Sequence, residues 1–227
     1  MEKKKVMGND EYTKKLEMAI QEFIRPLKNL PFHLIINILS GYEVEKFNPD
    51  DSNHKKTLEA LKAIARLSCQ LINKKGIKRK RANEVGNDIE KYVIQAFRKC
   101  NYKADKPSTS QGKKKSTGYP DLEFCVLDNK WHYLECKSYN IKNKSTSMRT
   151  FYLSPSKDFK ITHSGIHFIL CFEIYQDHRE DDFNVYKTKG WKILDAYNLD
   201  IDLKYEFNSD NRRLYKPELI LAEENIQ

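Results

Sequence analysis

The sequence predicts an α/β (α+β) fold in which a mixed central β-sheet is flanked by helices and preceded by a helical N-terminal region. Apolar residues recur at helical spacing as far as about residue 99, and segments with a two-residue alternation follow from residue 121 onward. This order of helices, a β-hairpin and further strands favours a mixed sheet. A length of 227 residues suits one large domain or a core with a helical extension.

The composition is that of a globular, basic protein. Charged residues make up 32% and hydrophobic residues 39% of the chain, and the formal net charge is +9. A basic balance favours an anionic partner, most commonly nucleic acid, and the alternative is a merely soluble cationic surface. The chain has five cysteines, which is an odd number, and no two of them form a CxxC motif. We therefore expect reduced core thiols rather than a disulfide framework or a zinc site.

The N-terminus has no apolar signal region, and no apolar run approaches the length of a membrane span. We therefore expect a cytoplasmic protein with no membrane partner.

The first third of the chain is expected to be mainly helical. Two prolines interrupt the region from residue 10 to about 75, and the short apolar segment 32–39 is either a helix or a strand. A longer helix is expected over residues 54–73, with Asp51 or Ser52 as its N-terminal cap. We place the boundary of this helical region at residue 82, so that residues 1–82 either contact DNA or form a dimer interface.

The remaining residues, 83–227, are expected to form the core domain with C-terminal strands. A helix with an apolar stripe covers about residues 83–99. The expected strands are 121–127, 130–138, 149–154, 166–175, 183–194 in pieces, and 201–207. The dense basic run 74–81 between the two regions is either a solvated linker or a phosphate-contacting loop.

The segment 117–140 is expected to be a β-hairpin whose two faces differ in chemistry. Because alternate residues of a strand share a face, Asp121 lies with Glu123 on one face of the first strand. By the same rule, Glu135 lies with Lys137 on one face of the second strand. The opposite, apolar face carries Leu122, Phe124, Val126, Leu134 and Cys136. One face is therefore expected to join the core, while the other gathers acids and a lysine.

The length of the connection decides whether the acids meet. A two-residue turn would pair Leu127 with Lys130 and put the apolar faces out of register. A three-residue connection would instead pair Val126 with Lys130. That pairing sets Asp121 opposite Glu135, with their Cβ atoms about 5 Å apart. Because burial of the apolar face selects the second register, we predict a connection of odd length.

Two adjacent carboxylates repel each other, and a shared cation removes this repulsion. Carboxylate oxygens are hard ligands that suit Mg²⁺. Such a metal ion lowers the pKa of a bound water and stabilises charge on a phosphoryl oxygen, and Lys137 beside it can orient the water. Phosphodiester hydrolysis needs these groups. The alternative is that Asp121 and Glu135 are ordinary surface charges with Lys137 as their salt-bridge partner.

The dipeptide Pro120-Asp121, followed after thirteen residues by Glu135-Cys136-Lys137, resembles the motif of the PD-(D/E)XK nuclease superfamily. A compact chain of this length is similar to the type II restriction endonucleases within it. The resemblance implies a restriction-endonuclease-like core in which Asp121 and Glu135 bind metal and Lys137 serves the attacking water. It also implies that the backbone carbonyl of Cys136 can bind the metal. It does not extend over the N-terminal third or the C-terminal segments.

Members of this superfamily often carry an acidic residue on the helix before the hairpin, here the helix expected over residues 83–99. Glu84 points away from the apolar stripe of that helix, and Asp88 lies on the flank of the stripe that does not carry Glu90. Glu90 shares a flank with Phe97 and faces the sheet. We therefore choose Glu90 as the fourth catalytic residue, the alternative being a surface carboxylate.

Cations and hydroxyl groups around the hairpin are expected to hold DNA phosphates or to contact base edges. The expected DNA-binding residues are Lys78, Arg79, Arg81, Lys113, Lys114, Lys115, Lys142, Lys144, Arg149, Ser156, Lys157 and Lys160. For each of these segments the alternative is a solvated loop or an edge strand.

Together, these features predict a Mg²⁺-dependent endonuclease that hydrolyses double-stranded DNA, in particular a sequence-specific type II restriction enzyme. The rivals are a repair or branched-DNA nuclease with the same core and a non-catalytic DNA-binding protein. The sequence contains no P-loop, so no nucleotide cofactor is expected. Because a symmetric target is matched most simply by a two-fold dimer, we expect a homodimer that uses the N-terminal helices or the late strands.

Overall fold

The computed structural model describes residues 8–25, 27–115, 117–127, 129–140, 151–154, 158–203 and 209–222. The chain divides into two compact units, Pro31–Asp200 and a smaller one formed by Met1–Leu30 and Ile201–Gln227. This division does not follow the boundary expected at residue 82, because helices on both sides of that residue pack into one hydrophobic core.

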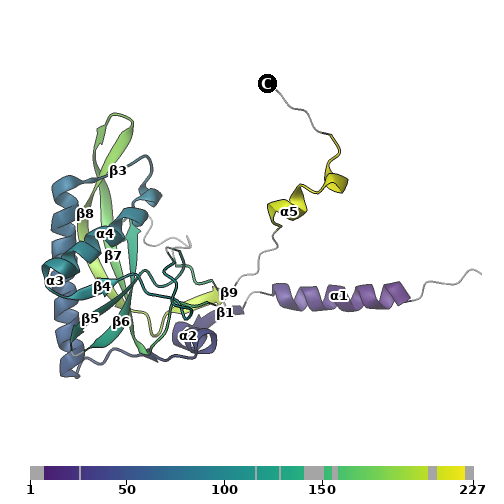
Figure 1. The fold of residues 1–227 in the computed structure, drawn as a ribbon, viewed down its shortest axis with the longest axis horizontal. Helices are drawn as coiled ribbons and strands as arrows, with labels where there is room; N and C mark the ends of the chain where they lie inside the picture. The colour runs from purple at the N-terminus through teal and green to yellow at the C-terminus, as the bar shows by residue number, and fades with distance from the viewer. Residues whose placement is uncertain are drawn as a thin grey trace, which may run out of the picture. The chain divides into compact units, whose positions relative to one another are not determined.

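The larger unit contains a mixed β-sheet, as predicted (Figure 1). Its helices are α2 (Phe32–Ser40), α3 (Ser52–Lys75) and α4 (Gly86–Lys99), with the 3₁₀ turn η1 (Ala82–Glu84) before α4. Its strands are β2 (Val44–Glu45), β3 (Ile77–Arg79), β4 (Lys103–Asp105), β5 (Leu122–Leu127), β6 (Lys130–Tyr139), β7 (Gly165–Glu180) and β8 (Phe183–Asp195). The strand order is β3-β8-β7-β6-β5-β4, and β2 pairs with β7 outside this path. β7 is parallel to β6 and β2, whereas the other pairs are antiparallel.

The smaller unit holds α1 (Gly8–Ile24), most of β1 (Leu27–Pro31) and β9 (Asp200–Leu203), α5 (Asn211–Leu214) and η3 (Pro217–Leu219). β1 and β9 form a two-stranded sheet of their own. The apolar stripe of α1 is exposed, with 68% of Phe23 accessible to solvent. In the part of the chain that the structure describes, no helix is both long enough and apolar enough to cross a membrane.

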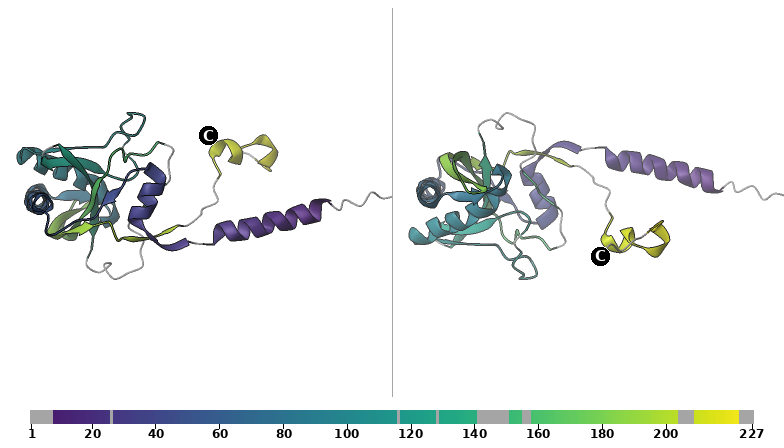
Figure 2. Two further views of the ribbon diagram at one scale, coloured as in Figure 1. Left: turned by 90° about the horizontal axis from the view of Figure 1, so that it is seen from below. Right: turned by 90° about the horizontal axis from the view of Figure 1, so that it is seen from above.

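Helices cover both faces of the main sheet (Figure 2). The central strands direct apolar side chains to each face in turn, and each face therefore needs a cover. On one face, α3 and α4 pack against Leu122 and Leu134 and their neighbours. On the other face, Phe32 of α2 packs against a second cluster that includes Tyr133 and Ile169. The hairpin β5–β6 therefore lies between two cores, and its polar residues can emerge only near its ends.

The cap of α3 settles one alternative that the sequence left open. The Asp51 side chain accepts hydrogen bonds from the backbone amides of Asn53 at 2.7 Å and His54 at 3.0 Å. Asp51 is therefore the N-cap, and the helix begins at Ser52, the next residue. The apolar segment after Pro31 is the helix α2 rather than a strand.

The basic run 74–81 is divided among several elements: Lys74 and Lys75 end α3, and Lys80 and Arg81 form a bend after a short strand. Residues 77–79 form β3, which pairs with β8 in an antiparallel register. Lys78 Nζ lies 2.7 Å from Glu180 Oε1, and Arg79 Nε lies 2.6 Å from Asp88 Oδ2. Two of the cations expected to contact DNA are thus paired with acids of the same chain.

The strands differ from expectation in three further places. The described part of the strand expected over residues 149–154 is irregular coil, and its Phe151 and Leu153 pack against the second core. β7 continues to Glu180, and β8 is one strand interrupted only by local irregularities in register. β9 ends at Leu203, and the rest of the strand expected there lies outside the described residues.

Candidate active site

The register of the hairpin brings Asp121 and Glu135 together. Leu122 pairs with Leu134, as expected, and the backbone amide of Asp121 donates to Glu135 Oε2 at 3.2 Å. The expected odd-length connection is wrong, however, because Leu127 pairs with Lys130 across a two-residue connection.

A β-bulge reconciles the short connection with the observed register. The pairing shifts between Cys125 and Leu127, so that Val126 is an extra residue on β5. One inserted residue restores the two-residue alternation beyond the bulge. The apolar side chains of Leu122 and Leu134 consequently face the same core.

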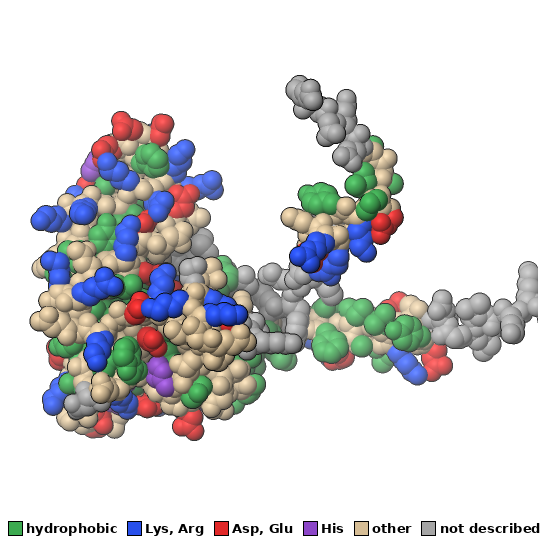
Figure 3. All heavy atoms as spheres, viewed as in Figure 1, with side chains coloured by type: hydrophobic (Ala, Val, Ile, Leu, Met, Phe, Trp, Pro, Cys, Tyr) green, Lys and Arg blue, Asp and Glu red, His purple; other side chains and the backbone are tan. Residues whose placement is uncertain are grey.

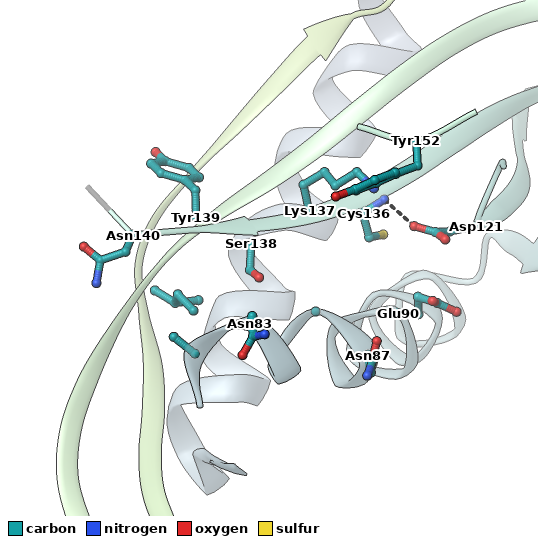
Figure 4. Close-up of a pocket in the computed structure, with 13 residues that line it drawn as sticks. Asn83, Asn87, Glu90, Asp121, Cys136, Lys137, Ser138, Tyr139, Asn140 and Tyr152 are labelled. Atoms are coloured by element: carbon teal, nitrogen blue, oxygen red, sulfur yellow. Dashed lines mark hydrogen bonds between the residues drawn. The ribbon is translucent and has the colours of Figure 1, made fainter. Parts of the chain in front are cut away.

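Hydrogen bonds join both carboxylates and the lysine into one network. The backbone amide of Cys136 donates to Asp121 Oδ2 at 2.8 Å, the bond drawn in Figure 4. Lys137 Nζ donates to Glu135 Oε1 at 2.6 Å. Glu135 also accepts a hydrogen bond from the backbone amide of Asp121. Asp121 is therefore held by the backbone of β6, and Glu135 is held by both Asp121 and Lys137. The arrangement orients both carboxylates before any ligand binds.

The electrostatics of the site favour a bound cation. Burial raises the pKa of Glu135, which is 4% exposed, and the charge of Asp121 raises it further. Burial also raises the pKa of Asp121, with the charge of Glu90 adding to the effect. Lys137 opposes both shifts. A buried acid and a half-buried acid that lie this close are stabilised in their charged form when a cation neutralises them.

Helix α4 carries Glu90 to the same place. A pocket of about 560 Å³ between α4 and β6 is lined by Glu90, Asp121, Cys136 and Lys137 among others (Figure 4). Glu90 Oε2 also lies 3.0 Å from Lys106 Nζ. The choice of Glu90 among the acids of this helix agrees with this placement.

The two other acids considered for this role, Asp88 of α4 and Glu84 of η1, point elsewhere. Asp88 is buried between Arg79 and Lys91, at 2.6 Å from a nitrogen of each. Glu84, in the 3₁₀ turn before α4, has its Oε1 atom 3.9 Å from Arg81 Nε. Glu90 is therefore the acid of this helix that shares a pocket with Asp121.

The donor set fits a hard divalent cation, because the converging ligands are carboxylate oxygens. The Cys136 thiol is buried, and burial raises its pKa well above the usual range, so its sulfur is unsuited to bind Mg²⁺. Within the described residues, no group of three or more His, Cys, Asp and Glu side chains is arranged to hold a metal ion. A cation at Asp121 and Glu135 would therefore complete its shell with backbone, water or substrate oxygens.

The residues expected to bind DNA are dispersed. Lys and Arg side chains are spread over the face of the larger unit in Figure 3, with acidic side chains between them. Lys113 is exposed, Lys114 pairs with Asp105, and Lys115 Nζ lies 2.9 Å from Asp158. Five further expected contacts lie outside the described residues: Lys142, Lys144, Arg149, Ser156 and Lys157.

Lys160 corrects the expectation of a surface contact. Only 4% of this residue is exposed, and its ammonium donates to the carbonyl oxygens of Gly118 at 2.7 Å and Pro120 at 3.1 Å. The side chain therefore points into the protein behind the turn that carries Asp121, where it cannot reach a DNA phosphate.

The sequence interpretation missed several polar residues of the pocket. Asn83 and Asn87 line it from the segment that also carries Glu90, and Ser138 and Tyr139 line it from β6 (Figure 4). The helical spacing of Asn83, Asn87 and Glu90 is a signal that could have revealed them, because such residues share one face.

Comparison with known proteins identifies the family. A family model described as the type II restriction enzyme MjaV family matches residues 26–218, a span that includes the whole candidate site. The type II restriction enzyme MjaV of Methanocaldococcus jannaschii is 36% identical over 239 aligned residues, covering 97% of this chain and 100% of that protein. The chain belongs to the MjaV family of type II restriction enzymes. The comparison with solved structures found no match.

Membership in the MjaV family confirms the resemblance of the chain to type II restriction endonucleases. Among the alternatives drawn from the sequence, it favours a sequence-specific restriction enzyme over a repair nuclease or a non-catalytic binder. For this class the partner is DNA, and a divalent metal ion is generally used.

Proposed function

We propose that this restriction enzyme hydrolyses phosphodiester bonds of double-stranded DNA with the help of Mg²⁺ bound at Asp121 and Glu135. The convergence of these two acids with Lys137 carries the proposal, since Lys137 Nζ lies 2.6 Å from Glu135 Oε1. A pair of neighbouring acids beside a lysine, with Asp121 and Lys137 lining a pocket, is typical of a functional site.

The protein groups have distinct tasks in this proposal. Bound Mg²⁺ supplies a water of lowered pKa and stabilises charge on the phosphoryl group. Asp121 and Glu135 hold the ion, and the Cys136 amide keeps Asp121 oriented through its 2.8 Å hydrogen bond. The carbonyl oxygen of Cys136 is a further candidate ligand. Lys137 presents ammonium protons that orient the attacking water and offset negative charge as it develops.

Glu90 has an auxiliary role in this proposal. It lines the pocket opposite β6, and Lys106 partly neutralises it at 3.0 Å. From there its carboxylate is suited to accept a hydrogen bond from the attacking water. Its contribution is expected to be smaller than that of Asp121, whose side chain is held directly by the backbone of β6.

The decisive experiment uses the purified full chain and a supercoiled plasmid that contains many short palindromes. Cleavage into discrete bands with Mg²⁺, and none with a chelator, supports the proposal. An Asp121→Ala protein purified in parallel excludes a contaminating nuclease. Sequencing the fragment ends then yields the recognition sequence and cut position. Structure-dependent nicks would favour the repair-nuclease alternative, and binding without cleavage under Mg²⁺ or Mn²⁺ would contradict the proposal.

We further propose that DNA contacts come from cations that remain available around the pocket. Lys113 is exposed and suited to phosphates. Arg81 is exposed too, but its Nε lies 3.9 Å from Glu84 Oε1. Lys78, Arg79, Lys114 and Lys115 would first have to leave their acidic partners. The cations between residues 142 and 157 stay candidates for the same role.

Assembly as a homodimer is part of the same proposal. The α1 helix exposes apolar side chains along one stripe, including 47% of Leu16 and 68% of Phe23. Exposed apolar stripes of this kind are usually covered by a partner. A second copy of the chain is the simplest partner, because a two-fold dimer presents two active sites to a symmetric duplex.

A further inference from the structure

Asp121 stands just outside the regular sheet. β5 begins at Leu122, so the ladder hydrogen bonds of the strand do not hold the residues that precede it. Strand β6 orients Asp121 through two hydrogen bonds, and the backbone that leads into this residue is held separately, at the turn formed by Gly118, Tyr119 and Pro120. We call these three residues the Asp121 turn.

Lys160 holds the Asp121 turn from behind. Its ammonium nitrogen lies 2.7 Å from the carbonyl oxygen of Gly118 and 3.1 Å from that of Pro120. Both oxygens belong to the backbone that leads directly into Asp121. One cation therefore connects both ends of the turn.

The base of Lys160 is itself well anchored. Its neighbours Phe159 and Ile161 are buried in the second core, with 7% and 2% exposure. On the turn, the hydroxyl of Tyr119 forms a 2.7 Å hydrogen bond with Nδ1 of buried His167. The Asp121 turn is thus held at each of its three residues by side chains of the region 160–167.

A buried ammonium group is costly unless its hydrogen bonds and charge are compensated. The two carbonyl oxygens supply hydrogen bonds, and the acids Asp121, Glu135 and Glu90 lie close enough to stabilise its positive charge. An apolar side chain would fill this core position without that cost. A lysine at this position is explained if its ammonium group helps to place the nearby acids of the site.

We propose that Lys160 is a positioning residue that holds the Asp121 turn and places the Asp121 carboxylate for metal binding. This inference rests on the proposed function of Asp121 and adds a residue that the nuclease motif does not contain. Lys160 touches neither substrate nor metal, because its ammonium is directed to backbone oxygens inside the protein.

The first test replaces Lys160 by Met, which keeps the length of the stem and removes the ammonium. We expect kcat to fall about 100-fold, as for other small displacements of a catalytic group, and DNA affinity measured with Ca²⁺ to change by less than about threefold. Lys62→Met is the matched control, since Lys62 pairs with Glu59 on the surface of α3. It should retain the wild-type rate.

A second readout does not depend on cleavage. Hydrogen exchange followed by mass spectrometry should show faster exchange in Lys160→Met for peptides covering residues 118–123, while peptides from α3 keep the wild-type rate. Unchanged exchange over the Asp121 turn would overturn the proposal. This holds even if the wild-type protein proves inactive on DNA, which would refute the proposed function alone.

Chemical rescue separates positioning by charge from simple filling of space. In Lys160→Ala, added propylammonium should restore part of the cleavage rate and raise the thermal unfolding temperature, whereas propanol should do neither. Equal effects of both compounds, or no effect of either, would contradict the proposal. This arm also serves as the test if Lys160→Met does not fold.

Discussion

The backbone amide of Cys136 donates a 2.8 Å hydrogen bond to the carboxylate of Asp121. Strand β6 therefore contributes to the site twice, through the side chains of Glu135 and Lys137 and through the main chain between them. A backbone donor cannot rotate away, so the orientation of Asp121 depends on the pairing of the two strands. Changes to any of these groups should consequently have distinct and measurable effects.

Removal of either acid should abolish cleavage. Asp121→Ala and Glu135→Ala each delete a proposed metal ligand and leave the other acid without its shared cation, so we expect losses of about a thousandfold or more. Cleavage rates of a plasmid under single-turnover conditions measure the effect. Glu123→Gln on the same hairpin is the control and should retain most activity. A loss of less than about tenfold for either acid would count against this site.

Removal of the lysine should separate chemistry from binding. Lys137→Ala should stop cleavage, because the ammonium acts on the attacking water, while DNA affinity stays close to that of the wild type. Gel shifts in Ca²⁺ report binding, and plasmid cleavage in Mg²⁺ reports chemistry. Lys187→Ala is the control, since Lys187 pairs with Asp177 on the surface hairpin. A lost gel shift in a folded Lys137→Ala protein would contradict this assignment.

The buried histidine behind the Asp121 turn predicts a dependence of stability on pH. Burial lowers the pKa of His167 to about 3, whereas an unfolded histidine titrates near pH 6.5. A depressed folded-state pKa means that the stability contribution is complete above about pH 6.5 and is lost as the pH falls toward 3. Protonation of the unfolded chain at pH 4.5 should remove roughly 2–3 kcal/mol through this one group.

Urea unfolding of wild type and His167→Gln at pH 7.5 and 4.5 measures this effect. The variant should be less stable at the higher pH, and the difference between the two proteins should shrink at the lower pH by that roughly 2–3 kcal/mol. His178→Gln, on the exposed β7–β8 hairpin, serves as the control for an ordinary surface histidine. A stability difference that is the same at both pH values would refute the prediction.

Charges on the apolar stripe of α1 should prevent dimerisation. Light scattering of the wild-type protein with cognate DNA is expected to give about twice the mass of the 26.9 kDa chain plus the mass of one duplex. The double variant Leu16→Asp and Phe23→Asp should behave as a monomer, because the exposed stripe would no longer be apolar. Gln21→Asp adds a charge to the same helix outside the stripe and should leave the mass unchanged. A wild-type monomer that produces nicked circles before linear DNA would refute the dimer.

The sequence by itself determined the two elements that carry the candidate site. Alternation along 121–127 and 130–138 predicted that Leu122, Leu134 and Cys136 share one buried face, because burial has a two-residue period that the chain encodes locally. It did not predict the second core, which buries Tyr133 on the opposite face. The same reasoning placed Asp121 opposite Glu135. The helical stripe of residues 83–99 singled out Glu90, which the structure brings to the pocket of Asp121.

The tertiary structure decided what depends on distant partners. The bulge at Val126 is invisible to a periodic pattern, because an extra residue can be absorbed either in the turn or in the strand. Lys78 pairs with Glu180, which lies 102 positions away, so the middle of a basic run that looks solvated is in fact a paired strand. Lys160 looked like a surface cation, and only the folding of the segment 158–161 into the core turned it toward the Asp121 turn. Local periodicity encodes burial, whereas the pairing of charges depends on which distant segments the fold brings together.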